Sequence, residues 1–563
     1  MMMKNSTKLL IILALAFGFR LVLMQWRFAI GFDEPHYLQM GAAAVQHGLG
    51  ALLHPYWPPM YPALVALFSL FGSDVELAGR LVNIVCGTLT LVPVFVLARA
   101  LFGEKPALLS VLLLAIFPAF AFSATDALSE SSYTFFSMSG LAAGWFALQR
   151  KSLRQAGMAG LFFGMAYLTK PEGLGYLGVF VGFALLWLFY RIVRFKKFDL
   201  VKIIATATAV VILVALPYLV YLKNATGDWT ISGKYKVNRF DVTSINKLSP
   251  DNKHLPLDMA YHLGTFADYD PDTHAGDDGH ARSLGALAAW IAQNLYKIFR
   301  SELAGAVTAP MFLLMVLGLF AGRWTWPQTR LQLYLLSYIV FFWLMVIPFF
   351  HINARYFAPL LPLCFVWIGQ GTDLLFRRFQ NFFEILPFKQ FPLSTDFAGK
   401  VMLTIVVITT SFLPEMGKIV ARSADDRDFW ADAVELKRAG DWLKANTSTT
   451  PVLMSYNKSV DFYAGQTDVR NTATFSFDPP DRVVQYARHR HVSHIVLSER
   501  YRPEFPNLEP LWQDEQRPGL RRVYDEAGDD GMHVLIYEIL PVEPEPTEEK
   551  TNGGLQNIDT DNK

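Results

Sequence analysis

The feature that most constrains this chain is a series of apolar runs, each about as long as a helix that crosses the hydrocarbon core of a membrane. The 563 residues are 52% hydrophobic and 18% charged, which is more apolar side chain than a soluble core needs, so the excess must face lipid. We therefore predict an α-helical polytopic membrane protein with about 11 transmembrane helices, near Leu9–Trp26, Val75–Ala100, Ala107–Ala124, Leu128–Leu148, Ala156–Thr169, Leu174–Tyr190, Val201–Leu222, Ala304–Ala321, Leu331–Phe350, Tyr356–Phe376 and Val401–Leu413.

The first apolar run has a second interpretation. Lys4 and Lys8 precede it, and the small residues Ala14 and Ala16 lie within it, as in a cleaved signal peptide. Because many further runs follow, we interpret it as an uncleaved first span.

Charge and cysteine content exclude two classes of function. A net charge of +1 and a pI of about 7.8 give no basic stripe for nucleic acid. The two cysteines, Cys86 and Cys364, both lie in apolar stretches, so neither a disulfide framework nor a cysteine-based metal site is available.

Basic residues set the expected orientation, since loops rich in Lys and Arg stay in the cytoplasm. The odd number of spans then places everything after about Pro414 on the outer side. We expect a multi-pass protein of the plasma or inner cell membrane with an extracytoplasmic C-terminus. With a cytoplasmic N-terminus, every inner segment is basic: Arg99–Lys105, Arg150–Arg154, Arg191–Lys202, Arg323–Arg330 and Arg377–Lys400.

This topology divides the chain into three parts. Residues 1–414 form the transmembrane part, whose long outer loops are 29–74 and 223–303. Residues 415–540 form a small extracytoplasmic α/β domain, and the Glu- and Pro-rich residues 541–563 form a disordered tail.

Shorter elements are expected on the outer side. Two amphipathic pieces of the first loop, Pro35–His47 and Pro59–Phe71, lie in the interface instead of crossing the membrane. In the C-terminal domain we predict one helix and three strands, at Asp428–Ala445, Val452–Ser455, Ile495–Leu497 and Val534–Tyr537.

The first candidate for chemistry is the acidic pair Asp33 and Glu34, directly after the first span on the outer side. A carboxylate at the membrane surface suits a general base that acts on a substrate with its other end in lipid. The alternative is a helix cap, because Asp followed by Pro35 is also a common helix start.

Three basic residues lie on the expected outer side, whereas most other basic residues of the membrane part lie on the inner side. Arg80, Lys170 and Arg355 fall at the outer ends of their spans. A lipid phosphate would compensate them and would match the donor fork of an arginine. Alternatively, each reaches the lipid headgroups or pairs with an acid such as Glu172.

Asp126 and Glu130 form a second acidic turn, between the third and fourth spans. If the stretch is helical they share one face and could position an acceptor or bind a divalent cation, whereas capping by Asp126 is the competing account. His54 and His351 are expected near the outer face, where each could bond a phosphate or a sugar hydroxyl and His54 is a candidate for the donor phosphate, although a single histidine there is more often structural. The acidic loop residues 268–278 lack the spacing of a calcium loop.

Five motifs, in this order, resemble signatures of the polytopic glycosyltransferases of the GT-C superfamily. These relatives include the protein O-mannosyltransferases, the aminoarabinose transferase acting on lipid A, and the RgtA/B/C/D-like enzymes. The motifs are Asp33-Glu34-Pro35-His36-Tyr37, His54-Pro55-Tyr56-Trp57-Pro58-Pro59-Met60-Tyr61-Pro62, Ala78-Gly79-Arg80-Leu81-Val82-Asn83, Tyr167-Leu168-Thr169-Lys170-Pro171-Glu172-Gly173 and Ala354-Arg355-Tyr356-Phe357-Ala358-Pro359-Leu360-Leu361-Pro362.

The resemblance implies a donor sugar on a polyprenyl phosphate, inversion at the anomeric carbon, and an acidic base in the first outer loop. Carried onto this sequence, the base is Asp33 with Glu34 as its neighbour, and the acceptor is a lipid, a glycan or a protein. Metal dependence differs among the relatives, so no metal is carried over. Tyr56-Trp57-Pro58 departs from the aminoarabinose transferase pattern, which has an acidic-basic pair before this proline.

Other functions remain alternatives. The many spans also fit a transporter or lipid flippase, although such proteins place ionisable groups near the midplane and not at the outer rim. A non-catalytic protein of polysaccharide assembly, or an oligosaccharide transferase, would use the same outer surface. The C-terminal region lacks a Gly-rich phosphate motif after a strand, which disfavours a nucleotide-sugar donor.

Overall fold

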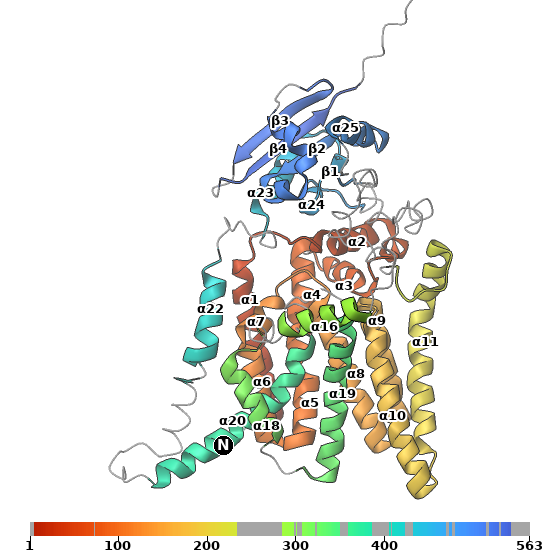
Figure 1. Ribbon diagram of the computed structural model, residues 1–563, viewed down its shortest axis with the longest axis vertical. Coiled ribbons are helices and arrows are strands. Elements are labelled where there is room, and N and C mark those ends of the chain that lie inside the picture. The colour runs from red at the N-terminus through yellow and green to blue at the C-terminus, as the bar shows by residue number, and fades with distance from the viewer. Residues whose placement is uncertain are drawn as a thin grey trace, which may run out of the picture.

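The computed structural model describes a bundle of helices with a small sheet at one end (Figure 1). Arg355, His351, the acidic residues 268–278 and nearly all of the predicted tail lie outside the described residues. The described residues are 5–72, 74–233, 284–297, 300, 307–320, 324–349, 359–385, 405–406, 408–422, 432–468, 472–475, 479–513, 517–527 and 531–541.

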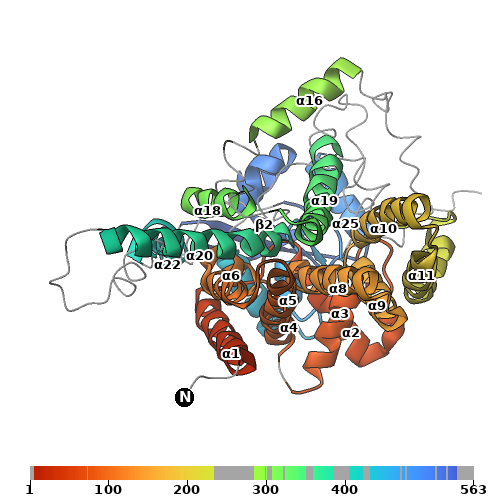
Figure 2. The same cartoon turned by 90° about the horizontal axis from the view of Figure 1, so that it is seen from below.

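Seen from below, α10 and α11 lie at one side of the bundle and α1 at another, while α20 runs across the view (Figure 2). Within the described residues, Ser6–Trp26, Val75–Phe102, Gly173–Phe195 and Asp199–Thr226 are long and apolar enough to cross a membrane. The bundle helices are α1 (Asn5–Leu23), α4 (Val75–Leu89), α5 (Leu91–Phe102), α6 (Glu104–Ile116), α7 (Pro118–Ser123), α8 (Glu130–Arg150), α9 (Leu153–Thr169), α10 (Gly173–Phe195), α11 (Asp199–Thr226), α16 (Leu284–Lys297), α18 (Ala309–Phe320), α19 (Trp326–Phe349), α20 (Leu361–Ile385) and α22 (Leu413–Val420).

Two predicted spans are interrupted by proline. Pro93 has no N–H to donate to the carbonyl of residue 89, and α4 gives way to α5 at Thr90. Phe117 precedes Pro118 and is extended, with ψ 113°, so α6 ends there and α7 begins. The predicted span Ala107–Ala124 therefore consists of two helices, α6 and α7, and not of one.

Close helix approach in the bundle depends on glycine. An added Cβ at Gly318 of α18 would overlap the carbonyl oxygen of Trp367 in α20, and one at Gly371 of α20 would overlap that of Leu314 in α18. The two backbones are thus in direct contact.

The two amphipathic pieces of the first loop are helices that lie on one end of the bundle, α2 (Glu34–His47) and α3 (Met60–Ser69), with the short 3₁₀ helices Met24–Trp26 and Leu49–Leu52 nearby (Figure 1). We call this end, which also carries the sheet, the sheet-facing end. Gly79 of α4 lets α2 approach, since a Cβ there would lie 2.6 Å from the Leu38 side chain.

The C-terminal part contains a four-stranded sheet in the order β1-β2-β4-β3. β1 and β2 are parallel and the other neighbours are antiparallel, with an irregularity between Arg522 and Tyr524. The strands are β1 (Leu453–Met454), β2 (His494–Ser498), β3 (Leu520–Ala527) and β4 (His533–Ile539), and the helices are α23 (Val434–Asn446), α24 (Ser459–Tyr463), α25 (Pro480–His489) and α26 (Glu509–Gln513), with 3₁₀ turns at Glu499–Glu504 and Pro506–Leu508.

The predicted fold class, a helical membrane protein with a small C-terminal α/β region, is confirmed. The predicted helix at Asp428–Ala445 corresponds to α23, and the three predicted strands correspond to β1, β2 and β4. The strand β3 and the helix α25 were not predicted. The last predicted span, Val401–Leu413, contains a π-helical turn at Ile408–Phe412 within its described residues.

Candidate functional site

The two acidic residues at the start of α2 differ in environment. Asp33 stands at the N-cap position and is partly exposed, but its side chain accepts no capping hydrogen bond, so the capping alternative is not supported. Glu34 is buried, and its two oxygens accept the backbone amides of Gly31 and Ala127, each at 2.9 Å. Burial raises the pKa of Glu34 to about 7.

Arg80 of α4 ties three segments together at this end. Its Nε and Nη2 donate to the Glu76 carboxylate at 3.2 and 2.7 Å, while Nη1 and Nη2 donate to the carbonyls of Thr125 and Ala29, both at 3.1 Å. All three guanidinium nitrogens therefore have protein partners. This arrangement supports a positioning role and offers no open donor fork for a phosphate.

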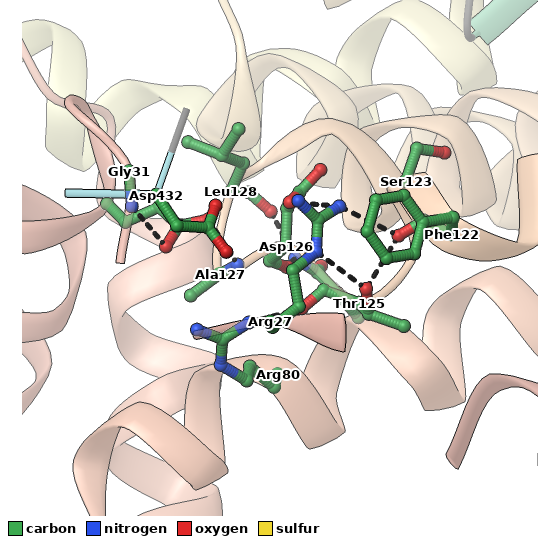
Figure 3. Close-up of polar contacts among 12 residues, drawn as sticks. Arg27, Gly31, Arg80, Phe122, Ser123, Thr125, Asp126, Ala127, Leu128 and Asp432 are labelled. Atoms are coloured by element: carbon green, nitrogen blue, oxygen red, sulfur yellow. Dashed lines mark hydrogen bonds and ion pairs between the residues drawn. The ribbon is translucent and has the colours of Figure 1, made fainter. Parts of the chain in front are cut away.

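Arg27, which follows α1, is the neighbouring cation (Figure 3). It pairs with Asp126 at 2.5 Å, donates to the Thr125 hydroxyl at 2.9 Å, and lies over the Phe122 ring at 3.7 Å from its centroid. Burial raises the pKa of Asp126, and Arg27 opposes that shift. Asp126 thus belongs to a largely buried ion pair.

Glu130 has a different partner. It accepts a hydrogen bond from Lys170 Nζ at 2.8 Å, and both side chains are largely buried. Because α8 begins at Glu130, Asp126 lies before the helix and the expected shared helical face does not form. Ser129, and not Asp126, is the N-cap residue of α8, so the capping account of Asp126 is wrong as well.

His54 shapes the loop before α3. It is buried, and its Nδ1 accepts the backbone amides of Tyr56 and Trp57 at 3.2 and 3.1 Å. The Trp57 ring stacks on His36 with centroids 4.8 Å apart. Burial lowers the pKa of His36 to about 4, so this imidazole is neutral at physiological pH.

The C-terminal part closes over the same end of the bundle. Asp432 accepts the amide of Phe28 at 2.9 Å, and the Tyr463 hydroxyl accepts the amide of Ile30 at 3.0 Å. Tyr463 also donates to Glu76 at 3.1 Å, and thereby joins the Arg80 cluster. The loop that leads into Asp33 is therefore held by the C-terminal part through Asp432 and Tyr463, and by α4 through Arg80.

The predicted site residues that the structure describes lie at one end of the bundle, but several residues that contact them were not predicted. Asp33, Glu34, Arg80, Asp126, Glu130, Lys170 and His54 all lie at the sheet-facing end, whereas Arg355 lies outside the described residues. Arg27 was missed, although it is a basic residue on the expected outer side, the same signal that singled out Arg80. Asp432 and Tyr463 carried no such signal.

Within the described residues, no group of three or more His, Cys, Asp or Glu side chains could hold a metal ion. Three acids at the sheet-facing end pair with cations: Asp126 with Arg27, Glu76 with Arg80, and Glu130 with Lys170.

Comparison with known proteins gives both a family match and structural neighbours. Residues 54–221 match the family model of the dolichyl-phosphate-mannose-protein mannosyltransferases. Comparison with curated proteins by sequence finds no match.

The solved structures that share the fold include those of two different membrane proteins. The oligosaccharyltransferase AglB of Archaeoglobus fulgidus, in complex with an inhibitory peptide and a dolichol-phosphate, superposes with a TM-score of 0.57 at 13% identity, over 94% of this chain and 74% of that one. ArnT from Cupriavidus metallidurans, bound to undecaprenyl phosphate, superposes with a TM-score of 0.51 at 15% identity, over 94% and 97% of the two chains.

Proposed function

Since this chain has the GT-C fold of polytopic membrane glycosyltransferases, we propose that it transfers a sugar from a polyprenyl-phosphate donor to a lipid, glycan or protein acceptor at the sheet-facing end. Structures of two proteins with this fold hold a dolichol-phosphate and an undecaprenyl phosphate, which supports a lipid-linked donor. The match to the mannosyltransferase model over residues 54–221 supports the same class of reaction.

The observation that carries the proposal is the contrast between Asp33 and Glu34. Glu34 is buried and committed to two backbone amides, so it holds the loop. Asp33 is partly exposed and is not used as a helix cap. The partial exposure of Asp33 supports it, of the two carboxylates, as the one that meets a substrate, and we assign it as the general base.

In this mechanism the Asp33 carboxylate accepts the proton of an acceptor hydroxyl as its oxygen attacks the anomeric carbon. The new bond joins that carbon to the acceptor oxygen, and the bond to the phosphate oxygen breaks, so its electron pair leaves with the lipid phosphate. Attack from the face opposite the phosphate inverts the anomeric configuration. The neutral His36 nearby does not neutralise the base.

For the leaving phosphate we propose Lys170. Its ammonium group pairs with Glu130 in this structure, and a lipid phosphate would compete for the same cation. Arg80 is committed to Glu76 and two carbonyl groups, so it acts by positioning the first loop. Arg355 stays a prediction.

The test of the base is the Asp33→Asn variant in membranes supplied with a polyprenyl-phosphate sugar. Loss of a general base lowers kcat by about 10² to 10⁴-fold, while the thermal unfolding midpoint stays unchanged. Asp74→Asn is the matched control, because Asp74 caps α4 and Asn caps equally well. Full turnover by Asp33→Asn would remove Asp33 from the mechanism.

The test of the phosphate site is Lys170→Gln, for which we expect a raised KM for the lipid donor and an unchanged KM for the acceptor. Lys223→Gln serves as its control, since Lys223 contacts only the Gly227 carbonyl and the Trp229 ring among described contacts. An unchanged donor KM in Lys170→Gln would contradict the assignment.

A further inference from the structure

The C-terminal part contains a cavity at the end of β2. Including its open mouth, it encloses about 350 Å³ between the side chains that line it. Tyr456 and Trp512 are the partly exposed aromatic residues of its wall, and its polar residues include Ser455, Asn457, Ser498 and Arg502. A wall of aromatic and aliphatic side chains with a few polar groups is the usual composition of a small-molecule site.

A buried hydroxyl in the cavity wall is left unsatisfied. Ser498 is 8% exposed, and its Oγ has no hydrogen-bond partner in the described part of the chain. Burying a hydroxyl without a partner is costly, so such a group inside a cavity indicates a ligand that supplies one.

The charge of the cavity wall is already compensated. The Arg502 guanidinium forms a two-pronged ion pair with Glu509, with Nε donating at 2.9 Å, and it lies over the Trp512 ring at 5.1 Å from the centroid. Because this cation has its own carboxylate, the cavity favours a neutral ligand over a phosphate or a carboxylate.

The cavity adjoins the loop that carries the proposed base. The Phe32 ring contacts Tyr456 edge-on, with centroids 5.2 Å apart, and lies 6.3 Å from the Tyr501 ring. Phe32 directly precedes Asp33. A ligand held between the cavity and this ring is therefore within a short reach of the Asp33 loop.

We propose that this cavity binds a neutral sugar ring of a glycan acceptor, an inference that rests on the proposed function. The apolar face of the ring lies at the mouth against Tyr456 and Trp512, and one sugar hydroxyl reaches inward to Ser498 Oγ. The cavity has room for about one water-sized group, and thus for that hydroxyl but not for the ring.

The test measures binding without turnover, by saturation-transfer NMR on the full chain in nanodiscs. The probes are the methyl α- and β-pyranosides of glucose, galactose, mannose and N-acetylglucosamine, and, separately, neutral hexapeptides that contain Ser or Thr. We expect saturation transfer to at least one of the glycosides. Ser498→Ala should weaken its binding about threefold to tenfold, the range for one lost hydrogen bond.

Trp512→Ala should remove glycoside binding, whereas Trp442→Ala should leave it unchanged. Trp442 is the matched control, since it packs on Tyr524, away from the cavity. The proposal is overturned if no glycoside shows saturation transfer, or if only the peptides show it. It is also overturned if neither Ser498→Ala nor Trp512→Ala changes the saturation transfer to the glycosides.

This outcome is separate from the fate of the proposed function. Failure of the proposed function appears as the absence of sugar transfer by the wild-type chain, whatever the NMR result. If the wild-type chain does transfer sugar, Ser498→Ala should raise the KM for a glycan acceptor and leave kcat unchanged. Asp33→Asn, in contrast, lowers kcat.

Discussion

The backbone amide of Phe28 donates a hydrogen bond of 2.9 Å to the carboxylate of Asp432, which lies 404 residues further along the chain. The same carboxylate pairs with Arg422 at 2.9 Å. Asp432 therefore joins the loop after α1 to the segment that follows α22, and it fixes the approach to Asp33.

Asp432→Ala should destabilise the protein by about 1 to 3 kcal/mol, because it leaves the Phe28 amide and the Arg422 guanidinium without their buried acceptor. The unfolding free energy measured in detergent by denaturant titration checks this value. Asp441→Ala, at an exposed position of α23, should stay within about 0.5 kcal/mol of the wild type. Equal stabilities of the two variants would contradict the role given to Asp432.

Glu34 and His36 should impose opposite pH dependences on stability. The pKa of Glu34 is raised to about 7 by burial, so the folded state binds the extra proton, and the unfolding free energy falls as pH rises from about 4.5 to about 7. The pKa of His36 is lowered to about 4 by burial, so the unfolded state binds the extra proton, and the unfolding free energy rises from about pH 4 to about 6.5.

These two slopes largely cancel between about pH 4.5 and 6.5, and single substitutions should separate them. Relative to the wild type, Glu34→Gln should gain stability with rising pH, and His36→Phe should lose it, each by up to about 1.4 kcal/mol per pH unit. Thermal unfolding across this range provides the measurement, with each variant as the control for the other. If stability changes with pH in the same way in both variants and in the wild type, then Glu34 and His36 do not impose the opposite slopes expected of them.

Arg80→Lys should lower the unfolding free energy by about 2 to 4 kcal/mol, because an ammonium group cannot contact Glu76, Thr125 and Ala29 together. Arg99→Lys, at an exposed position of α5, is the control. If Arg80 instead bound the donor phosphate, the substitution would raise the donor KM and leave the stability unchanged.

Gly371→Ala should destabilise the bundle by about 2 to 3 kcal/mol, since the new methyl group overlaps the Leu314 carbonyl and must push α18 from α20. Gly182→Ala in α10, where a Cβ meets no atom within 4 Å, should lie within about 1 kcal/mol of the wild type on the stabilising side. Denaturant titration in detergent gives the unfolding midpoints of the two variants. Similar unfolding midpoints would show that α18 and α20 have room to separate.

Much of the fold follows from patterns that are local in sequence. The apolar lengths of α1, α10 and α11 and the amphipathic pattern of α2 were sufficient to predict those helices. The strand β3 was missed because it is an edge strand with several charged residues, including Arg521 and Asp525, and lacks the apolar alternation of a buried strand.

The site was predictable only in part, for a physical reason. Position relative to a span singled out Arg80 and Lys170, but it could not say whether a protein acid or a ligand compensates each charge. The partners that decide this question come from distant segments, as in Phe28 with Asp432 or Ile30 with Tyr463. Contacts between such segments leave no periodic trace in the sequence.

The bond between Phe28 and Asp432 also has a consequence for the timing of biosynthesis. At roughly 5 to 20 residues per second, a ribosome needs about 20 to 80 s to synthesise the 404 residues between them. During that interval the nascent chain already exposes the loop before Asp33, but its final anchor does not yet exist. The loop therefore takes its finished shape late, and a chain arrested before residue 432 is inserted in the membrane without a completed site.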